Sequence, residues 1–131
     1  MKKKAILCVD DEKIVLESLR DQLRKYFKDT HLLESAESVD EALEVISDME
    51  KDGINLIVIV SDWLMPGMKG DEFLIKLHEK YPDIKKILLT GQADPEAIQR
   101  AEQNNALYQL IHKPWDEKEL IEAVTKGKEN A

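Results

Sequence analysis

The sequence predicts a doubly wound α/β sandwich, in which a five-stranded parallel sheet lies between two layers of helices. Short β-rich runs alternate with segments of helical periodicity along the chain. The run 56–60 is apolar throughout, which is typical of a central parallel strand that helices cover on both faces. Right-handed crossovers would join the strands. With 131 residues, 43% of them hydrophobic, the chain fits a single domain over 1–131.

Five segments are predicted to form strands, at 4–9, 31–35, 56–61, 86–90 and 107–112. The segment 31–35 has only Leu32 and Leu33 as an apolar centre, so we expect it at an edge of the sheet. Cys8 lies inside the apolar run of the first strand and is expected to be a buried core thiol. As the single cysteine of the chain it cannot form an internal disulfide.

The segments between the strands carry apolar residues at helical spacing. These apolar faces are Val15, Leu19, Leu23 and Tyr26, then Val39, Ala42, Leu43 and Ile46, then Phe73, Leu74, Leu77 and Tyr81, and finally Leu120, Ile121 and Val124. A shorter helix fits 95–104. Ser38 followed by Glu41 resembles a capping box, and Asp94 before Pro95 suits an N-cap followed by proline at the first helical position.

The composition argues against several classes of function. The chain has 19 Lys and Arg against 27 Asp and Glu, and its net charge of −8 disfavours direct binding to nucleic acid or an anionic membrane. No apolar stretch reaches the ~20 residues that span a bilayer. Five apolar residues after the basic N-terminus are too few for a signal peptide, so we expect a cytoplasmic protein. Phosphate-binding loops of the G-x-x-x-x-G-K-[ST] or G-x-G-x-x-G type are absent from the sequence.

Polar residues gather where the predicted strands end. In open parallel sheets the carboxyl ends of the strands share one rim, and ligands bind there. The residues are Asp10, Asp11 and Glu12 after the first strand, Ser61 and Asp62 at the end of the third, Thr90 at the end of the fourth and Lys113 after the fifth. Three acids, a hydroxyl and an ammonium group are therefore expected at one rim.

Each of these residues also has a simpler explanation. Asp10 and Asp11 could cap the first helix, Asp62 could open a polar loop, Thr90 could end a strand and Lys113 could be a solvated charge. Their joint placement favours a site, because three carboxylates brought together without a cation repel one another. Mg²⁺ binds a few carboxylates together with waters and phosphate oxygens, and Lys113 could pair with a carboxylate or a phosphoryl oxygen.

At these positions the sequence resembles the receiver domains of bacterial response regulators, over about 4–126. The resemblance rests on four motifs that follow the expected strands in order, and one motif alone would be a weak signal. The motifs are Val9-Asp10-Asp11-Glu12, Ser61-Asp62-Trp63-Leu64-Met65-Pro66-Gly67-Met68-Lys69-Gly70, Leu89-Thr90-Gly91 and His112-Lys113-Pro114-Trp115. The resemblance implies a single receiver domain with the flavodoxin-like fold and strand order 2-1-3-4-5.

The resemblance also implies a role for each site residue. Asp62 is expected to be the phosphoacceptor and a ligand of Mg²⁺. The other expected metal ligands are Asp11 directly, Asp10 through water, and the backbone carbonyl of Leu64. Thr90 would hydrogen-bond the phosphoryl group and Lys113 would form an ion pair with it, which agrees with the need to neutralise charge during transfer.

The implied function is a phosphorylation-dependent signalling switch of a two-component system or phosphorelay. The phosphoryl group would come from a sensor histidine kinase or a histidine phosphotransfer protein. The phosphorylated domain would change its 91–115 surface and regulate a partner or a downstream effector domain. Such a domain is not an enzyme, since it promotes only its own phosphorylation and dephosphorylation.

The sequence departs from the family's usual pattern at the switch position. An aromatic residue usually stands three positions before the lysine, but here that residue is Leu110. Tyr108 is an odd number of residues from Lys113 and is expected to face the opposite side of the strand. The proline after Lys113 must turn the chain out of the strand, so we expect the Lys113–Pro114 bond to be cis.

Two other interpretations stay open from the sequence. The chain could be a degenerate receiver-like module that binds partners without phosphorylation, although it retains both Asp62 and Lys113. It could also be an aspartyl-phosphate hydrolase that acts on external substrates. Those enzymes carry a D-x-D pattern after the first strand, which Asp10-Asp11-Glu12 does not supply.

Overall fold

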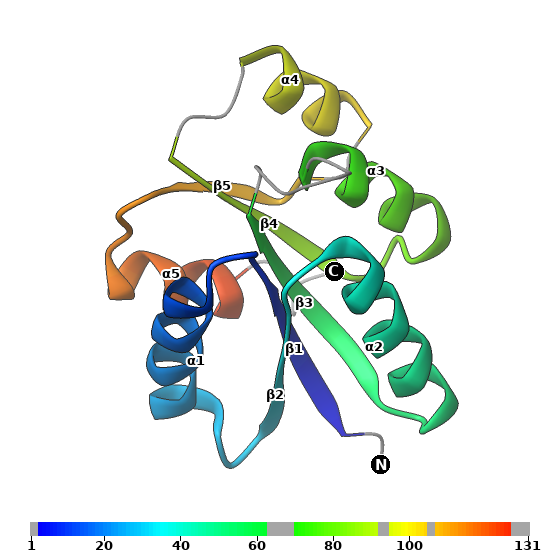
Figure 1. The fold of residues 1–131 in the computed structure, drawn as a ribbon, viewed down its shortest axis with the longest axis vertical. Coiled ribbons are helices and arrows are strands. Elements are labelled where there is room, and N and C mark those ends of the chain that lie inside the picture. Colours follow the sequence, from blue (N-terminus) through cyan, green and yellow to red (C-terminus); the bar gives the residue numbers. More distant parts are fainter. Residues whose placement is uncertain (1–2, 63–69, 92–94, 105–106, 127–131) are drawn as a thin grey trace.

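Five parallel strands form one sheet in the order β2-β1-β3-β4-β5, as predicted (Figure 1). The computed structural model describes residues 3–62, 70–91, 95–104 and 107–126. The strands are β1 (Lys4–Val9), β2 (His31–Ala36), β3 (Asn55–Asp62), β4 (Lys85–Thr90) and β5 (Gln109–His112). The expected edge position of 31–35 is confirmed, since β2 pairs with β1.

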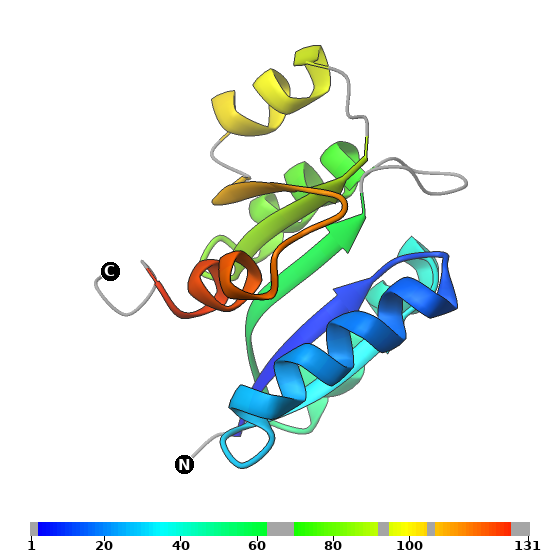
Figure 2. The same cartoon turned by 90° about the vertical axis from the view of Figure 1, so that its left-hand side faces the viewer.

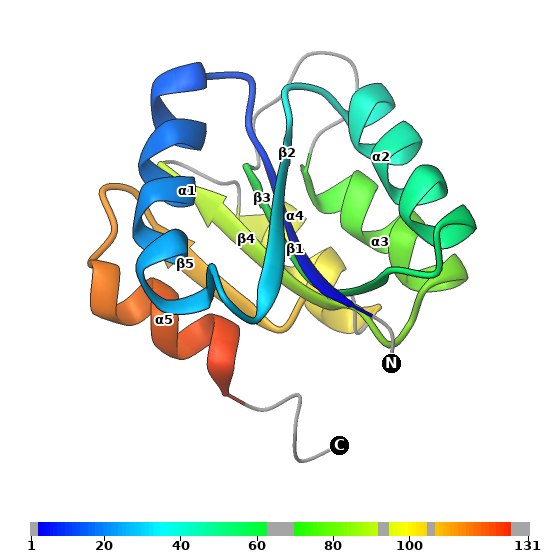
Figure 3. The same cartoon turned by 90° about the horizontal axis from the view of Figure 1, so that it is seen from below.

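Helices cover both faces of the sheet. They are α1 (Lys13–Phe27), α2 (Val39–Lys51), α3 (Gly70–Lys80), α4 (Pro95–Gln103) and α5 (Glu117–Thr125). Figures 2 and 3 show α1 and α5 on one face and α2 and α3 on the other, with α4 beside α3. The predicted doubly wound sandwich is therefore confirmed. No helix in the described ranges is long and apolar enough to cross a membrane.

The two faces of the sheet belong to two separate core clusters, because successive side chains of a strand point to opposite faces. In β1, Ala5, Leu7 and Val9 join the cluster under α2 and α3. Ile6 and Cys8 join the cluster under α1 and α5. Cys8 is buried, as predicted, and burial raises the pKa of its thiol to about 12. The thiol is consequently uncharged and unreactive at neutral pH.

Two residues assigned to core-facing helical stripes are exposed instead. Tyr26 is 55% exposed and Leu43 is 45% exposed, so these two predictions were wrong. In α1 the buried face includes Leu16 and Phe27, one position along from Val15 and Tyr26. Both sets have helical spacing, and periodicity alone does not distinguish them. In α2 the side chain of Leu43 lines a surface groove against α3.

Helix α2 is capped at both ends. Ser38 Oγ accepts a hydrogen bond from the Glu41 backbone N–H at 3.1 Å, as the capping-box pattern predicts. The Glu41 carboxylate accepts from the N–H of Glu37 rather than from that of Ser38, at 2.7 Å. At the C-terminal end, Gly53 has a φ of 71°, and the N–H of Ile54 donates to the Met49 carbonyl at 2.9 Å. This is the Schellman arrangement that favours glycine.

The region around β4 and β5 differs from the sequence prediction. Strand β5 begins at Gln109, so Tyr108 precedes the strand and the alternation argument does not apply to it. The Tyr108 ring lies 4.7 Å from the Nζ of Lys85, at the opposite end of β4 from Thr90. Lys85 and Lys86 are both buried, which their charge would not suggest. The Asp94 cap expected before α4 lies outside the described residues.

Candidate functional site

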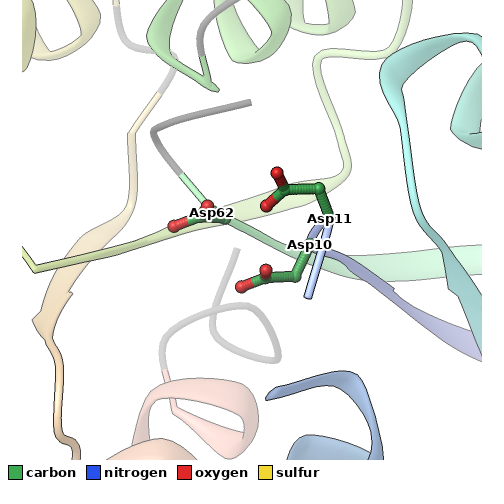
Figure 4. A group of neighbouring side chains, drawn as sticks. All are labelled: Asp10, Asp11 and Asp62. Carbon is green, nitrogen blue, oxygen red and sulfur yellow. The ribbon is translucent and has the colours of Figure 1, made fainter. Parts of the chain in front are cut away.

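Three carboxylates meet at the carboxyl ends of β1 and β3. Asp10 and Asp11 directly follow β1, and Asp62 is the last residue of β3. One carboxylate oxygen from each residue lies within 4.8 Å of the other two. Figure 4 shows the three side chains directed toward a common space. Asp10 and Asp62 are buried whereas Asp11 is exposed, so the cluster opens to solvent on the Asp11 side.

Lys113 joins this cluster from the end of β5. Its Nζ lies 2.9 Å from Oδ1 of Asp62 and 3.1 Å from Oδ2 of Asp10. Its backbone N–H donates to the Thr90 carbonyl at 2.8 Å, which fixes the end of β5 against β4. The Lys113–Pro114 bond is cis, as predicted. The ammonium group therefore bridges two strand ends that are not neighbours of β5.

Asp10 uses both of its carboxylate oxygens. Its Oδ1 accepts a hydrogen bond from the Glu12 backbone N–H at 2.9 Å, and its Oδ2 faces Lys113. The N-cap of α1 is Glu12, and its side chain makes no capping hydrogen bond. Asp10 thus holds the turn into α1 and the ammonium group at once, so helix capping alone does not explain it. The Glu12 carboxylate lies 4.0 Å from Lys113 at the solvent side.

The electrostatics of the cluster oppose the charge of Asp62. Burial raises the pKa of Asp62, and the nearby charges of Asp10 and Asp11 add to this effect, against the opposing influence of Lys113. The pKa of Lys113 is also raised, because its hydrogen bonds to Asp62 and Asp10 outweigh the effect of its own burial. Lys113 is therefore charged at neutral pH. In the pair, it is the charged form of Asp62 that its surroundings disfavour.

The carboxylates fit a hard divalent cation. Asp10, Asp11 and Asp62 supply three negative charges close together, and Lys113 supplies one positive charge. Carboxylate oxygens with an open, solvent-facing side are the ligand environment in which Mg²⁺ keeps part of its water shell.

The other predicted site residues are placed as follows. Thr90 is buried at the end of β4, directly after Leu89, which pairs with Asp62 in the sheet. Ser61 is buried, and its hydroxyl donates to the Asp62 carbonyl at 3.1 Å. Leu64, expected to offer its carbonyl to the metal, lies outside the described residues.

Comparison with known proteins gives the family. A sequence profile of the response regulator receiver domain matches residues 6–125. The chain belongs to the response regulator receiver domain family. This receiver is also similar to the hydrogenase transcriptional regulatory protein HoxA of Cupriavidus necator, with 33% identity over 128 residues. It is similar to the C4-dicarboxylate transport transcriptional regulatory protein DctD of Pseudomonas aeruginosa, with 33% identity over 125 residues.

These matches cover 98% and 95% of the receiver but only 25% of each relative, so the receiver spans about a quarter of their length. Among solved structures, it resembles the signal receiver domain of an HD domain-containing protein from Pseudomonas fluorescens Pf-5. The TM-score is 0.86, with 28% identity over 98% of this chain and 97% of that one. A receiver domain protein from Methanospirillum hungatei JF-1 gives a TM-score of 0.82 and 28% identity, over 98% and 96% of the two chains.

Membership in this family establishes the broad function. The receiver is a phosphorylation-dependent signalling module, not an enzyme that acts on external substrates, and a histidine kinase is its implied partner. The hydrolase interpretation is thereby overturned.

Sequence reasoning missed one group of residues near the site. The indole N–H of Trp115 donates to Oε1 of Gln22 on α1 at 2.7 Å. The two residues are 93 positions apart, and no local pattern links them. The HKPW motif had drawn attention to Trp115, but nothing in the sequence indicated its partner.

Proposed function

We propose that Asp62 accepts the phosphoryl group in a Mg²⁺-dependent transfer from a phosphohistidine. The observation that supports this most directly is the Lys113 ammonium group, shared by Asp62 and Asp10 within a cluster of three carboxylates. Asp62 is the acid that ends the central strand β3, and it is more exposed than the fully buried Asp10.

The side chains have distinct roles in this proposal. An Asp62 Oδ atom attacks phosphorus, the O–P bond forms as the N–P bond of the donor breaks, and the imidazole leaves with the electron pair and takes up a proton. Lys113 supplies a positive charge beside the transferred group, and Thr90 offers a hydroxyl from the neighbouring strand. Asp10, Asp11, Asp62 and the Leu64 carbonyl would hold Mg²⁺, which would offset negative charge when bound.

The proposed donor is a sensor histidine kinase or a histidine phosphotransfer protein. The proposed response is a change of the 91–115 surface, which a partner or an effector domain would sense. The curated relatives named above are transcriptional regulatory proteins several times longer than this receiver, which fits a receiver that controls a further domain.

Acetyl phosphate with Mg²⁺ tests the assignment directly. Intact-mass spectrometry should detect one added phosphoryl group on the wild-type protein and none when EDTA replaces Mg²⁺. Asp62→Asn should abolish the addition, and Asp11→Ala should raise the Mg²⁺ concentration needed for it by at least about tenfold. Asp29→Asn, at an exposed acid in the turn after α1, is the matched control and should behave like wild type.

Each alternative predicts a different result. A degenerate receiver would gain no mass under any condition. Transfer to another acid would leave the Asp62→Asn protein still phosphorylated, and peptide mapping would then identify the true acceptor.

A further inference from the structure

Two segments that adjoin site residues are joined outside the site by side-chain contacts. The first segment is helix α1, which begins directly after the Asp10–Glu12 turn. The second is the loop after β5, which contains Trp115 and leads into α5. Trp115 Nε1 donates to Gln22 Oε1 at 2.7 Å, and both side chains are partly buried.

A second, more exposed set of contacts lies beside this one. Glu117 pairs with the Lys25 ammonium group at 3.2 Å and accepts a hydrogen bond from the Tyr26 hydroxyl at 3.4 Å. The Lys25 side chain is 62% exposed, so solvent screens this pair and its contribution is small. The Gln22–Trp115 hydrogen bond is shorter and uncharged. It is also partly buried, so solvent screens it less than the Lys25–Glu117 pair.

The sheet does not supply this connection. β5 is a four-residue strand at the edge, and β3 and β4 separate it from β1. Consequently no sheet hydrogen bond can tie the loop after β5 to the segment after β1. Lys113 must nonetheless keep its Nζ within 3.1 Å of Asp10 and 2.9 Å of Asp62. Its backbone is held on one side by the Thr90 carbonyl, and Trp115 lies two residues further on.

We propose that Gln22 and Trp115 are positioning residues for Lys113. The Trp115 ring packs on the core cluster under α1 and α5, and its N–H fixes the loop to α1. Because α1 also starts at the acidic turn, the same helix continues from the turn that carries Asp10 and contacts the loop that follows Lys113. This inference rests on the proposed function, since it assigns Gln22 and Trp115 to the binding of the phosphoryl group.

The role separates two binding steps. In the proposed function the three aspartates hold Mg²⁺, whereas Lys113, which contacts Asp10 and Asp62, pairs with the phosphoryl group once it is bound. Loss of the Gln22–Trp115 contact should therefore leave Mg²⁺ binding nearly unchanged and weaken the binding of a phosphoryl analogue. Loss of a contact that only stabilises the fold would not weaken the binding of the phosphoryl analogue while leaving Mg²⁺ binding unchanged.

NMR titrations with Mg²⁺ alone, and with beryllofluoride in the presence of Mg²⁺, measure the two steps. Gln22→Ala and Trp115→Phe should each weaken beryllofluoride binding about fivefold, the loss expected for one hydrogen bond. Both should change the Mg²⁺ affinity less than about twofold. Gln22→Glu retains an acceptor for the indole and should restore binding. Arg24→Ala, at an exposed position of the same helix, is the matched control.

A double-mutant cycle decides between positioning and independent stabilisation. In a Lys113→Ala background, Gln22→Ala should weaken beryllofluoride binding no further. Full additivity of the two substitutions, or wild-type affinity in both Gln22→Ala and Trp115→Phe, would overturn the positioning role. Failure of the wild-type protein itself to bind beryllofluoride would instead overturn the proposed function on which the inference rests.

Discussion

Asp62 combines two requirements that oppose each other. The proposed phosphoryl transfer needs its carboxylate in the charged form, yet burial and the neighbouring acids Asp10 and Asp11 raise its pKa. Lys113 limits that rise by hydrogen bonding to it, at 2.9 Å. The charged carboxylate is thus held in a site that disfavours it. A divalent cation or an incoming phosphoryl group then alters the balance of charge around it.

This conflict predicts that Asp62→Asn stabilises the protein in buffer without divalent cations. A raised folded-state pKa means that the folded state binds more protons than the unfolded state, above the ordinary value of 3.8. Wild-type stability therefore falls as the pH rises through the folded pKa. Asn does not titrate, so the variant should be more stable than wild type at pH 7, and the gain should vanish below about pH 3.8.

Urea denaturation at a series of pH values measures this difference. Asp29→Asn, at an exposed acid, should show no such gain. Addition of Mg²⁺ should reverse the order of the two proteins, since a cation that binds the folded wild type stabilises it by mass action. A gain that persisted unchanged at pH 3 would contradict the electrostatic explanation.

At the scale of the elements, helix α5 depends on a residue from another element for its C-terminal cap. It has no basic residue in its last turn. The buried Lys85 of β4 donates instead to the carbonyls of Ala123 and Val124 at 2.8 and 2.9 Å, and also to the carbonyl of Lys126. Its charge satisfies backbone groups that a helix end otherwise leaves without partners, and it complements the helix dipole.

Lys85→Met should consequently destabilise the protein by about 2 kcal/mol, because it leaves buried carbonyl groups without donors. The loss should be concentrated in α5. Amide hydrogen exchange should accelerate there more than in α1 or α2. Lys118→Met, at an exposed position of α5, serves as the control. Equal exchange rates in α5 of the variant and the wild type would refute the capping role.

Helix α2 offers a second test at this scale. Ser38→Ala removes the oxygen that accepts from the Glu41 N–H, and should cost about 1 kcal/mol of unfolding free energy. Ser47→Ala, within the same helix, should be neutral or slightly stabilising, because alanine has the higher helix propensity. Chemical denaturation of the three proteins gives the comparison. A loss in Ser47→Ala as large as that in Ser38→Ala would show that capping is not the cause.

At the scale of the whole molecule, neither Tyr108 nor Leu110 is placed to act as the aromatic switch residue that the family usually carries three positions before the lysine. The Tyr108 ring lies against Lys85, near the end of the sheet opposite the acidic cluster. Leu110 is partly buried against the core cluster under α2 and α3. A response to phosphorylation is therefore expected to travel through Thr90, α4 and the segment 110–118, as a population shift between two arrangements of that surface.

Beryllofluoride with Mg²⁺ should accordingly change NMR chemical shifts at Thr90, in α4 and over 110–118. The Tyr108 ring signals should change little. Asp62→Asn provides the control, in which these changes should disappear. A change of rotamer at Tyr108, or shift changes confined to the acidic cluster, would contradict this route.

The sequence by itself determined the architecture and the composition of the site. Hydrophobic period and strand-like runs depend on neighbours a few residues away, so they are readable without a structure. Once five parallel strands are predicted, their carboxyl ends must share one rim. This rule alone predicts that Asp10, Asp62, Thr90 and Lys113 lie together.

The tertiary structure alone decided how the parts contact one another. It selected Phe27 over Tyr26 for the core, because both fit the helical period and only packing against the sheet distinguishes them. It buried Lys85 against the C-terminal end of α5, where the two carbonyl groups that accept from it belong to residues 38 and 39 positions later in the chain. It also joined Gln22 to Trp115 across 93 positions. Such contacts depend on how the elements pack in space, so local sequence patterns do not predict them.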